Sequence, residues 1–500
     1  MVSPHAAPAG PREVWFRRAL LALAAIAGLG ALAYFGLAVW AENEFTQPES
    51  IVAVQSMALS RDGSLYYGLK DYPYTVCAYM PIFYLLDAGL IRLGVSALLA
   101  GRIIGVAALL AILVLIRRLA MLYTGDRHCA WTATLLSAST SLLLGWGTVG
   151  QVDTLAVCFS LAAFDCYSRF ALKGQASLVP AMALALAALF TKQTMIAAPM
   201  AIFGLLWFQH KRKALLFAAV VAGGGGLAVL AINAALDGRF LANTVLANLN
   251  PFSLEKLSRQ LNHFSLAAGA LALIAAAGLR AALTTPARAL YVYLGLALGV
   301  FALTASKVGS DLNYQVEATI LLILAVSAAL HSLGFFQALF AGRGWVTLLQ
   351  IPLALHLAYN LRLSGGLLLE RILKEAAFRH QLAELAPYVS DGGRVLSAEM
   401  NGVLRLRGRL EVEPLIYTLL VRAGRVDPGR LSRDLRGGRV FSTIVLYQDV
   451  RRPGNPGPEF PTLPEDQLRE IRESYTLAAH IPGPYLDGLY VYRPAQRGAL

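Results

Sequence analysis

Two lysines in the apolar part of the chain most need a chemical explanation. Lys192 interrupts a long apolar run from Ala176 to Phe208, within the segment Thr-Lys-Gln-Thr at residues 191–194. Lys307 lies in the polar segment SKVGSDLNYQVE, between two further apolar runs. An ammonium group at membrane depth is unfavourable unless it faces water, protein or an anion. We therefore expect both lysines to bind a phosphate group. For Lys192 the alternative is a connector lysine that snorkels to the lipid headgroups.

Carboxylates form the second group of candidate residues. The stretch 41–95, called the first loop below, combines acidic side chains with the aromatic sequence YPYTVCAYMPIFYLL at 72–86. Its acidic residues include Glu42, Glu44, Glu49, Asp62 and Asp71. A carboxylate can deprotonate a hydroxyl nucleophile, and a lysine can hold a phosphate and stabilise it as it leaves. This combination suits transfer of a sugar from a lipid phosphate.

Other polar residues lie at the ends of apolar segments. Asp153 follows Gly150-Gln151 at the start of a predicted helix, where substrate binding and simple capping both suit a carboxylate. Arg102 is a third phosphate candidate, and its alternatives are snorkelling or a contact between helices. Tyr79 is a candidate pocket residue, although an interfacial aromatic belt explains it as well. The remaining candidates for substrate binding are Gln193, Asp311, Asn313 and Glu317.

Composition places these residues in a membrane protein. Of the 500 residues, 57% are hydrophobic and 15% charged, which excludes an ordinary soluble globule and indicates a polytopic α-helical membrane protein. The net charge of +13 does not predict a nucleic-acid partner, because most basic residues stand at the ends of apolar segments. The four cysteines, Cys77, Cys129, Cys158 and Cys166, show no metal-ligand spacing. We expect no metal and no cofactor, although loop carboxylates could assemble a divalent-metal site in three dimensions.

Hydropathy and charge predict the elements that position these groups. We expect about 11 spans, at residues 19–40, 96–116, 129–148, 152–170, 176–191, 194–209, 214–236, 264–283, 289–305, 314–333 and 345–363. With a cytoplasmic N-terminus, the basic clusters near residues 117, 127, 170, 212, 280 and 343 all fall on the cytoplasmic side, as the positive-inside rule requires. The first loop, Lys192 and Lys307 then lie together on the outer side, and Lys192 is at the tip of a helical hairpin.

A change of composition predicts a second domain. Residues 1–363 form the predicted transmembrane catalytic domain, and residues 364–500 are richer in charge, proline and glycine. RVLSAE, RVFSTIVLYQDV, YTLAAHI and GLYVYRP are predicted strands, whereas PLIYTLLVRAG and PEDQLREIRESY are predicted helices. The parity of the spans places this small α/β domain on the outer face of the membrane.

The motifs, taken in order, resemble those of a known family. PESIVAVQSMALSRDGSLYY, AYMPIFYLL, Gly101-Arg102, GQVDTLAV, LFTKQT and KVGSDLNYQVE are similar to motifs of the bacterial membrane glycosyltransferases of the C superfamily. The resemblance is to the family-39-like group, which is related to protein mannosyltransferases and aminoarabinose transferases, and it covers most of the membrane part.

The resemblance implies an enzyme of the bacterial inner membrane. Such an enzyme takes the sugar from a polyprenyl-phosphate donor and inverts the configuration at the anomeric carbon. It uses a first-loop carboxylate as general base. Glu49 best matches the family's acidic position, but Pro48 and Ser50 replace the commoner adjacent acidic pair. Glu44, Asp62 and Asp71 therefore remain rival bases.

A multi-span transporter or lipid flippase is the alternative function, because interrupted helices and buried lysines also occur in transporters. The sugar, the acceptor, the linkage and the oligomeric state are not specified by the sequence.

Overall fold

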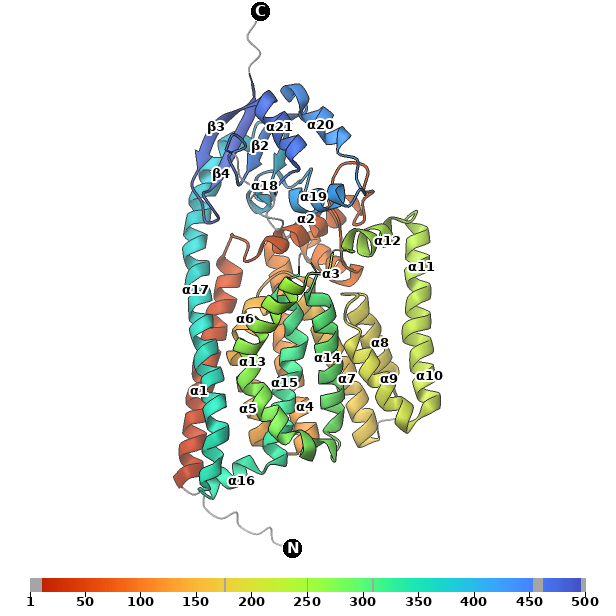
Figure 1. The fold of residues 1–500 in the computed structure, drawn as a ribbon, viewed down its shortest axis with the longest axis vertical. Coiled ribbons are helices and arrows are strands. Elements are labelled where there is room, and N and C mark those ends of the chain that lie inside the picture. The colour runs from red at the N-terminus through yellow and green to blue at the C-terminus, as the bar shows by residue number, and fades with distance from the viewer. Residues whose placement is uncertain (1–10, 175–176, 250, 308–309, 453–461, 496–500) are drawn as a thin grey trace, which may run out of the picture.

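The computed structural model describes residues 11–174, 177–249, 251–307, 310–452 and 462–495. A bundle of long helices forms one part of the molecule, and an α/β domain covers one end of it (Figure 1). The first loop lies between the bundle and this domain. This arrangement makes the first loop the layer in which groups from both parts can meet.

The bundle contains helices of very different lengths. Its elements are α1 (Pro11–Trp40), α4 (Ala97–Thr124), α5 (Arg127–Ser139), α6 (Ser141–Gly147), α7 (Val152–Lys173), α8 (Val179–Leu189), α9 (Ala197–Gln209), α10 (Lys211–Ala218), η1 (Ala219–Gly224), α11 (Gly225–Ala235), α13 (Leu254–Leu283), α14 (Arg288–Ala305), η3 (Leu312–Gln315), α15 (Val316–Ser332), α16 (Phe335–Phe340), η4 (Gly344–Val346) and α17 (Thr347–Val389). Among the described residues, six helical segments are long and apolar enough to cross a membrane: α4, α7, α10–α11, α13, α14 and η3–α15. The count of eleven spans and their orientation stay predictions.

Close backbone packing joins α4 to the segment that precedes α7. A Cβ atom at Gly101 would lie 2.9 Å from the Cα of Gly150, and one at Gly105 would lie 2.9 Å from the carbonyl oxygen of Val149. Any side chain at these two positions would push the segments apart. The glycines therefore bring Arg102 and the residues before Asp153 to the same place.

The interruption around Lys192 is a turn between two helices. α8 ends at Leu189 and α9 begins at Ala197, so each is shorter than the roughly 20 residues that span a hydrocarbon core. The side chain of Gln193 ties this turn to the first loop, because its Nε2 donates to the carbonyl oxygen of Ala78 at 2.8 Å. The break predicted at residues 191–194 is confirmed.

The first loop carries two helices, α2 (Gln47–Asp62) and α3 (Pro81–Arg92). Proline occupies the first turn of each, and Gly63 ends α2 with a φ of 68°. The loop also touches the α/β domain, because Tyr74 and Val412 form an isolated parallel bridge. A second connecting region, between α11 and α13, carries α12 (Arg239–Thr244) and η2 (Leu246–Asn248).

The α/β domain is built on one four-stranded sheet with the order β1-β2-β4-β3. β1 (Arg394–Ser397) is parallel to β2 (Phe441–Leu446), and β4 (Leu489–Pro494) is antiparallel to both β2 and β3 (Tyr475–Ile481). Its helical elements are α18 (Met400–Arg407), α19 (Pro414–Arg422), α20 (Gly429–Leu435), η5 (Arg436–Gly438) and α21 (Glu465–Ser474). The strands and helices predicted in this region are all present.

One helix connects the two parts. α17 has 43 residues, a length of about 65 Å at 1.5 Å per residue, and it runs beside α1 up to the α/β domain (Figure 1). The phenol of Tyr34 on α1 donates to the carbonyl oxygen of Ser364 on α17 at 2.7 Å. The helix thus continues unbroken past residue 363, the predicted end of the membrane domain, and side chains from its upper half can reach the first loop.

The packing of α4 leads to a test by substitution. Gly101→Ala should destabilise the protein by about 1–3 kcal/mol, because the added methyl group meets backbone rather than a movable side chain. Gly295→Ala on α14 is the matched control, since no atom lies within 4 Å of its added Cβ. Thermal unfolding in detergent should show a lower midpoint for Gly101→Ala alone; equal midpoints would contradict this packing.

Candidate functional site

A buried ion pair lies at the start of α2. Nε of Arg102 donates to Oε1 of Glu49 at 2.8 Å, and Nη2 donates to Oε2 at 3.0 Å. Both side chains are about 1% exposed or less. The carboxylate also accepts from the backbone N–H of Phe45 at 2.7 Å and of Gly150 at 2.8 Å. Both oxygens of Glu49 are therefore fully occupied as hydrogen-bond acceptors.

Arg102 also fixes the chain between α1 and α2. Its Nη1 donates to the carbonyl oxygens of Ala38 and Ala41, at 3.2 and 2.7 Å, and its Nη2 donates to that of Asn43 at 2.6 Å. The guanidinium carbon lies 4.0 Å from the ring centroid of Phe45. The structure thus places Arg102 in contact with the first loop rather than with lipid headgroups.

Lys192 lies in a second buried cluster. Its ammonium group forms an ion pair with Oδ1 of Asp153, and both side chains are buried. The Lys192 nitrogen lies 4.0 Å from the ring centroid of Tyr314 and 5.7 Å from that of Tyr79. Oδ2 of Asp153 has no hydrogen-bond partner among the described residues. Four segments that are distant in sequence, the first loop, α7, the turn between α8 and α9, and η3, thus bring a lysine, a carboxylate and two phenols together.

Four further candidate residues lie just before the tenth predicted span or at its start. Glu317 is buried and accepts from the phenol of Tyr293 at 2.6 Å. Asn313 is buried, and its Oδ1 has no partner within the described part of the chain. Asp311 is exposed and accepts from the N–H of Leu312 at 2.7 Å. Lys307 is half-buried and pairs through its backbone with Phe252.

A cavity of about 570 Å³ lies next to the Glu49–Arg102 pair. Polar or charged residues on its wall are Thr46, Ser141, His263, Asp311, Gln315, Tyr359, Arg362, Glu370 and Arg371. Its apolar wall includes Phe45, Leu142, Trp146, Val149, Leu363 and Leu367. Neither Lys192 nor Lys307 is among the described residues that line it. The cavity thus joins the first loop, α6, η3, α13 and α17.

Arg371 is the buried cation of this cavity, and the sequence analysis did not identify it. Its side chain is 6% exposed, and its guanidinium carbon lies 4.0 Å from the ring centroid of Phe45. Nη1 donates to Oγ1 of Thr148 and Nη2 to the carbonyl oxygen of Gly145, both at 2.9 Å. Nε has no partner among the described residues. Arg371 lies 23 positions before the first residue of β1, Arg394. The sequence would mark it as a site residue only if α17 were known to continue this far.

The three rival bases of the first loop, Glu44, Asp62 and Asp71, have different surroundings. Glu44 is 4% exposed, and its Oε2 has no partner among the residues described. Burial, followed by the nearby Glu399 carboxylate, holds the pKa of Glu44 well above its usual range. Asp62 is exposed and borders a separate pocket of about 290 Å³ against the α/β domain. Asp71 is exposed and forms an ion pair with Arg430.

Contacts with the α/β domain surround Glu44. The phenol of Tyr485 donates to the carbonyl oxygen of Glu44 at 3.0 Å. Glu375 on α17 accepts from the N–H of Glu42 and of Asn43, at 3.0 and 2.8 Å for its Oε2. Burial raises the pKa of Glu399, at the start of α18, to about 7. The chain around Glu44 is therefore bound on one side by the α/β domain and α17, and on the other by Arg102.

Comparisons with known proteins identify the fold. No protein-family model and no curated protein sequence matches the chain. The structure is similar to the crystal structure of ArnT from Cupriavidus metallidurans bound to undecaprenyl phosphate, with a TM-score of 0.63, 13% identity and coverage of 95% of this chain and 98% of that one. The apo form of the same protein matches at a TM-score of 0.63 with 11% identity, over 95% of this chain and 98% of that one.

A further match is the Archaeoglobus fulgidus oligosaccharyltransferase tethered to an acceptor peptide, with a TM-score of 0.51 and 12% identity, over 97% of this chain and 75% of that one. Identities this low show the fold and not the activity. Both proteins are membrane glycosyltransferases of the C superfamily. The resemblance in the sequence motifs is thus confirmed, and the chain has the fold of the C-superfamily membrane glycosyltransferases.

Proposed function

We propose that the protein transfers a sugar from a polyprenyl-phosphate donor to an acceptor hydroxyl, with the donor phosphate bound by Arg371 in the 570 Å³ cavity. The observation that carries this proposal is the buried guanidinium of Arg371, which has only neutral hydrogen-bond acceptors. Among the described residues, no carboxylate lies within ion-pair distance of it.

Electrostatics favours an anionic ligand at this position. A buried charge is unfavourable without a counter-charge, and the free Nε leaves Arg371 a donor for a further acceptor. Guanidinium groups bind phosphate oxygens in a planar, often bidentate geometry. Glu49 and Glu370 are close enough to interact electrostatically with Arg371, but neither forms an ion pair with it. A phosphate in the cavity would supply a directly bound negative charge and accept from Nε.

The apolar wall of the cavity suits the rest of the donor. Leu142, Trp146, Val149, Leu363 and Leu367 line it, and they offer a surface for the first isoprene units of a lipid tail. The bound undecaprenyl phosphate of the Cupriavidus metallidurans protein supports the same ligand class for this fold.

For the general base we propose Glu44. Glu49 has no free acceptor oxygen, whereas Oε2 of Glu44 is unpartnered, and the residues after Glu44, Phe45 and Thr46, line the cavity. In this scheme Glu44 removes the proton of the acceptor hydroxyl. The hydroxyl oxygen forms a bond to the anomeric carbon, and the bond from that carbon to the phosphate oxygen breaks.

The polyprenyl phosphate leaves with the electron pair of the broken bond, and Arg371 stabilises its charge. A single displacement of this kind inverts the configuration at the anomeric carbon. The proposal gives Glu49 and Lys192 positioning roles. Glu49 fixes the first loop on Arg102, and Lys192 fixes the turn between α8 and α9 on Asp153.

Loss of the Arg371 charge should weaken donor binding. Arg371→Gln should raise the Kd for undecaprenyl phosphate about 10- to 100-fold. This change corresponds to the loss of one charge-assisted hydrogen bond, which contributes ~1.5–3 kcal/mol. Binding to the purified protein in nanodiscs measures this effect. Arg379→Gln, an exposed position on the same helix, is the control. An unchanged Kd for Arg371→Gln would refute the assigned phosphate site.

The two glutamates should respond differently to substitution. Glu44→Gln should reduce release of polyprenyl phosphate from a donor about 10²- to 10⁴-fold while thermal stability is kept. Glu49→Gln should instead lower the stability by about 3–5 kcal/mol, because it leaves the buried Arg102 charge unpaired. Scanning calorimetry and a donor-release assay separate the two effects. Full activity of Glu44→Gln would exclude Glu44 as the base.

The raised pKa of Glu44 gives the pH profile a defined direction. The base must be ionised, and its pKa lies well above the ordinary glutamate value. Activity should therefore fall as the pH is lowered through this raised pKa, at a higher pH than for an ordinary glutamate. A pH–rate profile that stays flat down to the ordinary glutamate range would contradict a raised pKa at the base.

A further inference from the structure

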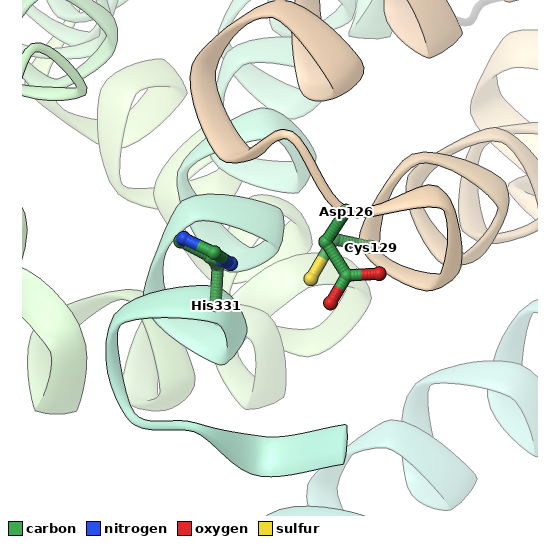
Figure 2. Close-up of side chains that lie close together, drawn as sticks. All are labelled: Asp126, Cys129 and His331. Atoms are coloured by element: carbon green, nitrogen blue, oxygen red, sulfur yellow. The ribbon is translucent and has the colours of Figure 1, made fainter. Parts of the chain in front are cut away.

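Three potential metal ligands meet at the end of the bundle that faces away from the α/β domain. Asp126 and Cys129 lie at the start of α5, and His331 lies near the end of α15 (Figure 2). A carboxylate oxygen, the sulfur and an imidazole nitrogen all lie within 4.8 Å of one another. Cys129 is buried, Asp126 is partly buried and His331 is exposed. The cluster is therefore accessible from one side.

The chemistry of these three ligands fits zinc. Zn²⁺ takes thiolate, imidazole and carboxylate ligands at about 2.0–2.3 Å, with tetrahedral geometry. Ligand atoms around such an ion are about 3.5 Å apart, so the cluster needs only a small contraction. The exposed ring of His331 has room to make this movement. Asp126 is already oriented, because its Oδ1 accepts from the N–H of His128 at 2.7 Å.

We propose that Asp126, Cys129 and His331 bind one Zn²⁺, with water in the fourth position. The ion would fasten the start of α5 to the end of α15, where Oγ of Ser327 already donates to the carbonyl oxygen of Cys129 at 3.2 Å. Together with η3, α15 forms the most buried of the candidate spans among the residues described.

The opposite end of the same helical segment reaches the cavity, since Gln315 of η3 lines it. A metal at the far end would thus hold in place the element that carries part of the cavity wall. The predicted orientation puts the metal site on the cytoplasmic side, where thiols remain reduced. The inference does not depend on the proposed sugar transfer.

Cobalt provides a direct spectroscopic test on the full chain, purified in detergent without a histidine tag. Titration of the metal-free protein with Co²⁺ alone should give about one bound ion per chain, with tetrahedral visible bands and a thiolate charge-transfer band in the near ultraviolet. Added Zn²⁺ should abolish both signals. Absence of the thiolate band in the unsubstituted protein would overturn the proposal.

Substitutions assign the ligands. His331→Ala should lose high-affinity Co²⁺ binding, and Asp126→Asn should weaken it while an asparagine keeps the helix cap. Cys129→Ser should lose the thiolate band. Because Cys129 is buried and this variant can fail to fold, the exposed His331 provides the decisive change. Cys166→Ser and His380→Ala are controls outside the cluster that should bind like the parent. Equal binding by His331→Ala and the parent would refute the site.

Discussion

The buried ion pair between Glu49 and Arg102 holds the first loop on the helical bundle, and the candidate site depends on it. The close packing of Gly101 on Gly150 places the arginine at the start of α4 beside the segment before α7. The carboxylate then binds Arg102, the N–H of Phe45 and the N–H of Gly150 together. Loss of either charge would leave the other buried without a partner, which is why one pair can order three chain segments.

The same region explains how the α/β domain can contribute to the site. Phe45 lies between the Glu49–Arg102 pair and the proposed phosphate site at Arg371, because the guanidinium carbons of Arg102 and Arg371 are both 4.0 Å from its ring centroid. Arg371 belongs to α17, whose Glu375 accepts two backbone N–H groups of the first loop. A shift of α17 together with the α/β domain would therefore displace both the cavity wall and the chain around Glu44.

The sequence predicted the membrane class, the break at Lys192 and the strands of the α/β domain, because each depends on local composition and periodicity. It also predicted Glu49 as the general base and Arg102 as a phosphate ligand, but not that they bind each other. The pairing of Lys192 with Asp153 and the meeting of Asp126 with His331 depend on packing between distant helices. Arg371 was missed because α17 continues beyond the end of its apolar stretch, and hydropathy alone does not mark that continuation.

The central claim is that a lipid phosphate binds beneath the α/β domain at Arg371. Determination of the structure with undecaprenyl phosphate bound, by electron cryo-microscopy in nanodiscs, tests it most directly. The account predicts phosphate density within hydrogen-bond distance of the Arg371 guanidinium, with the lipid tail along Trp146 and Leu367. Phosphate density at Lys192 or Lys307, with an empty cavity beside Phe45, would contradict it.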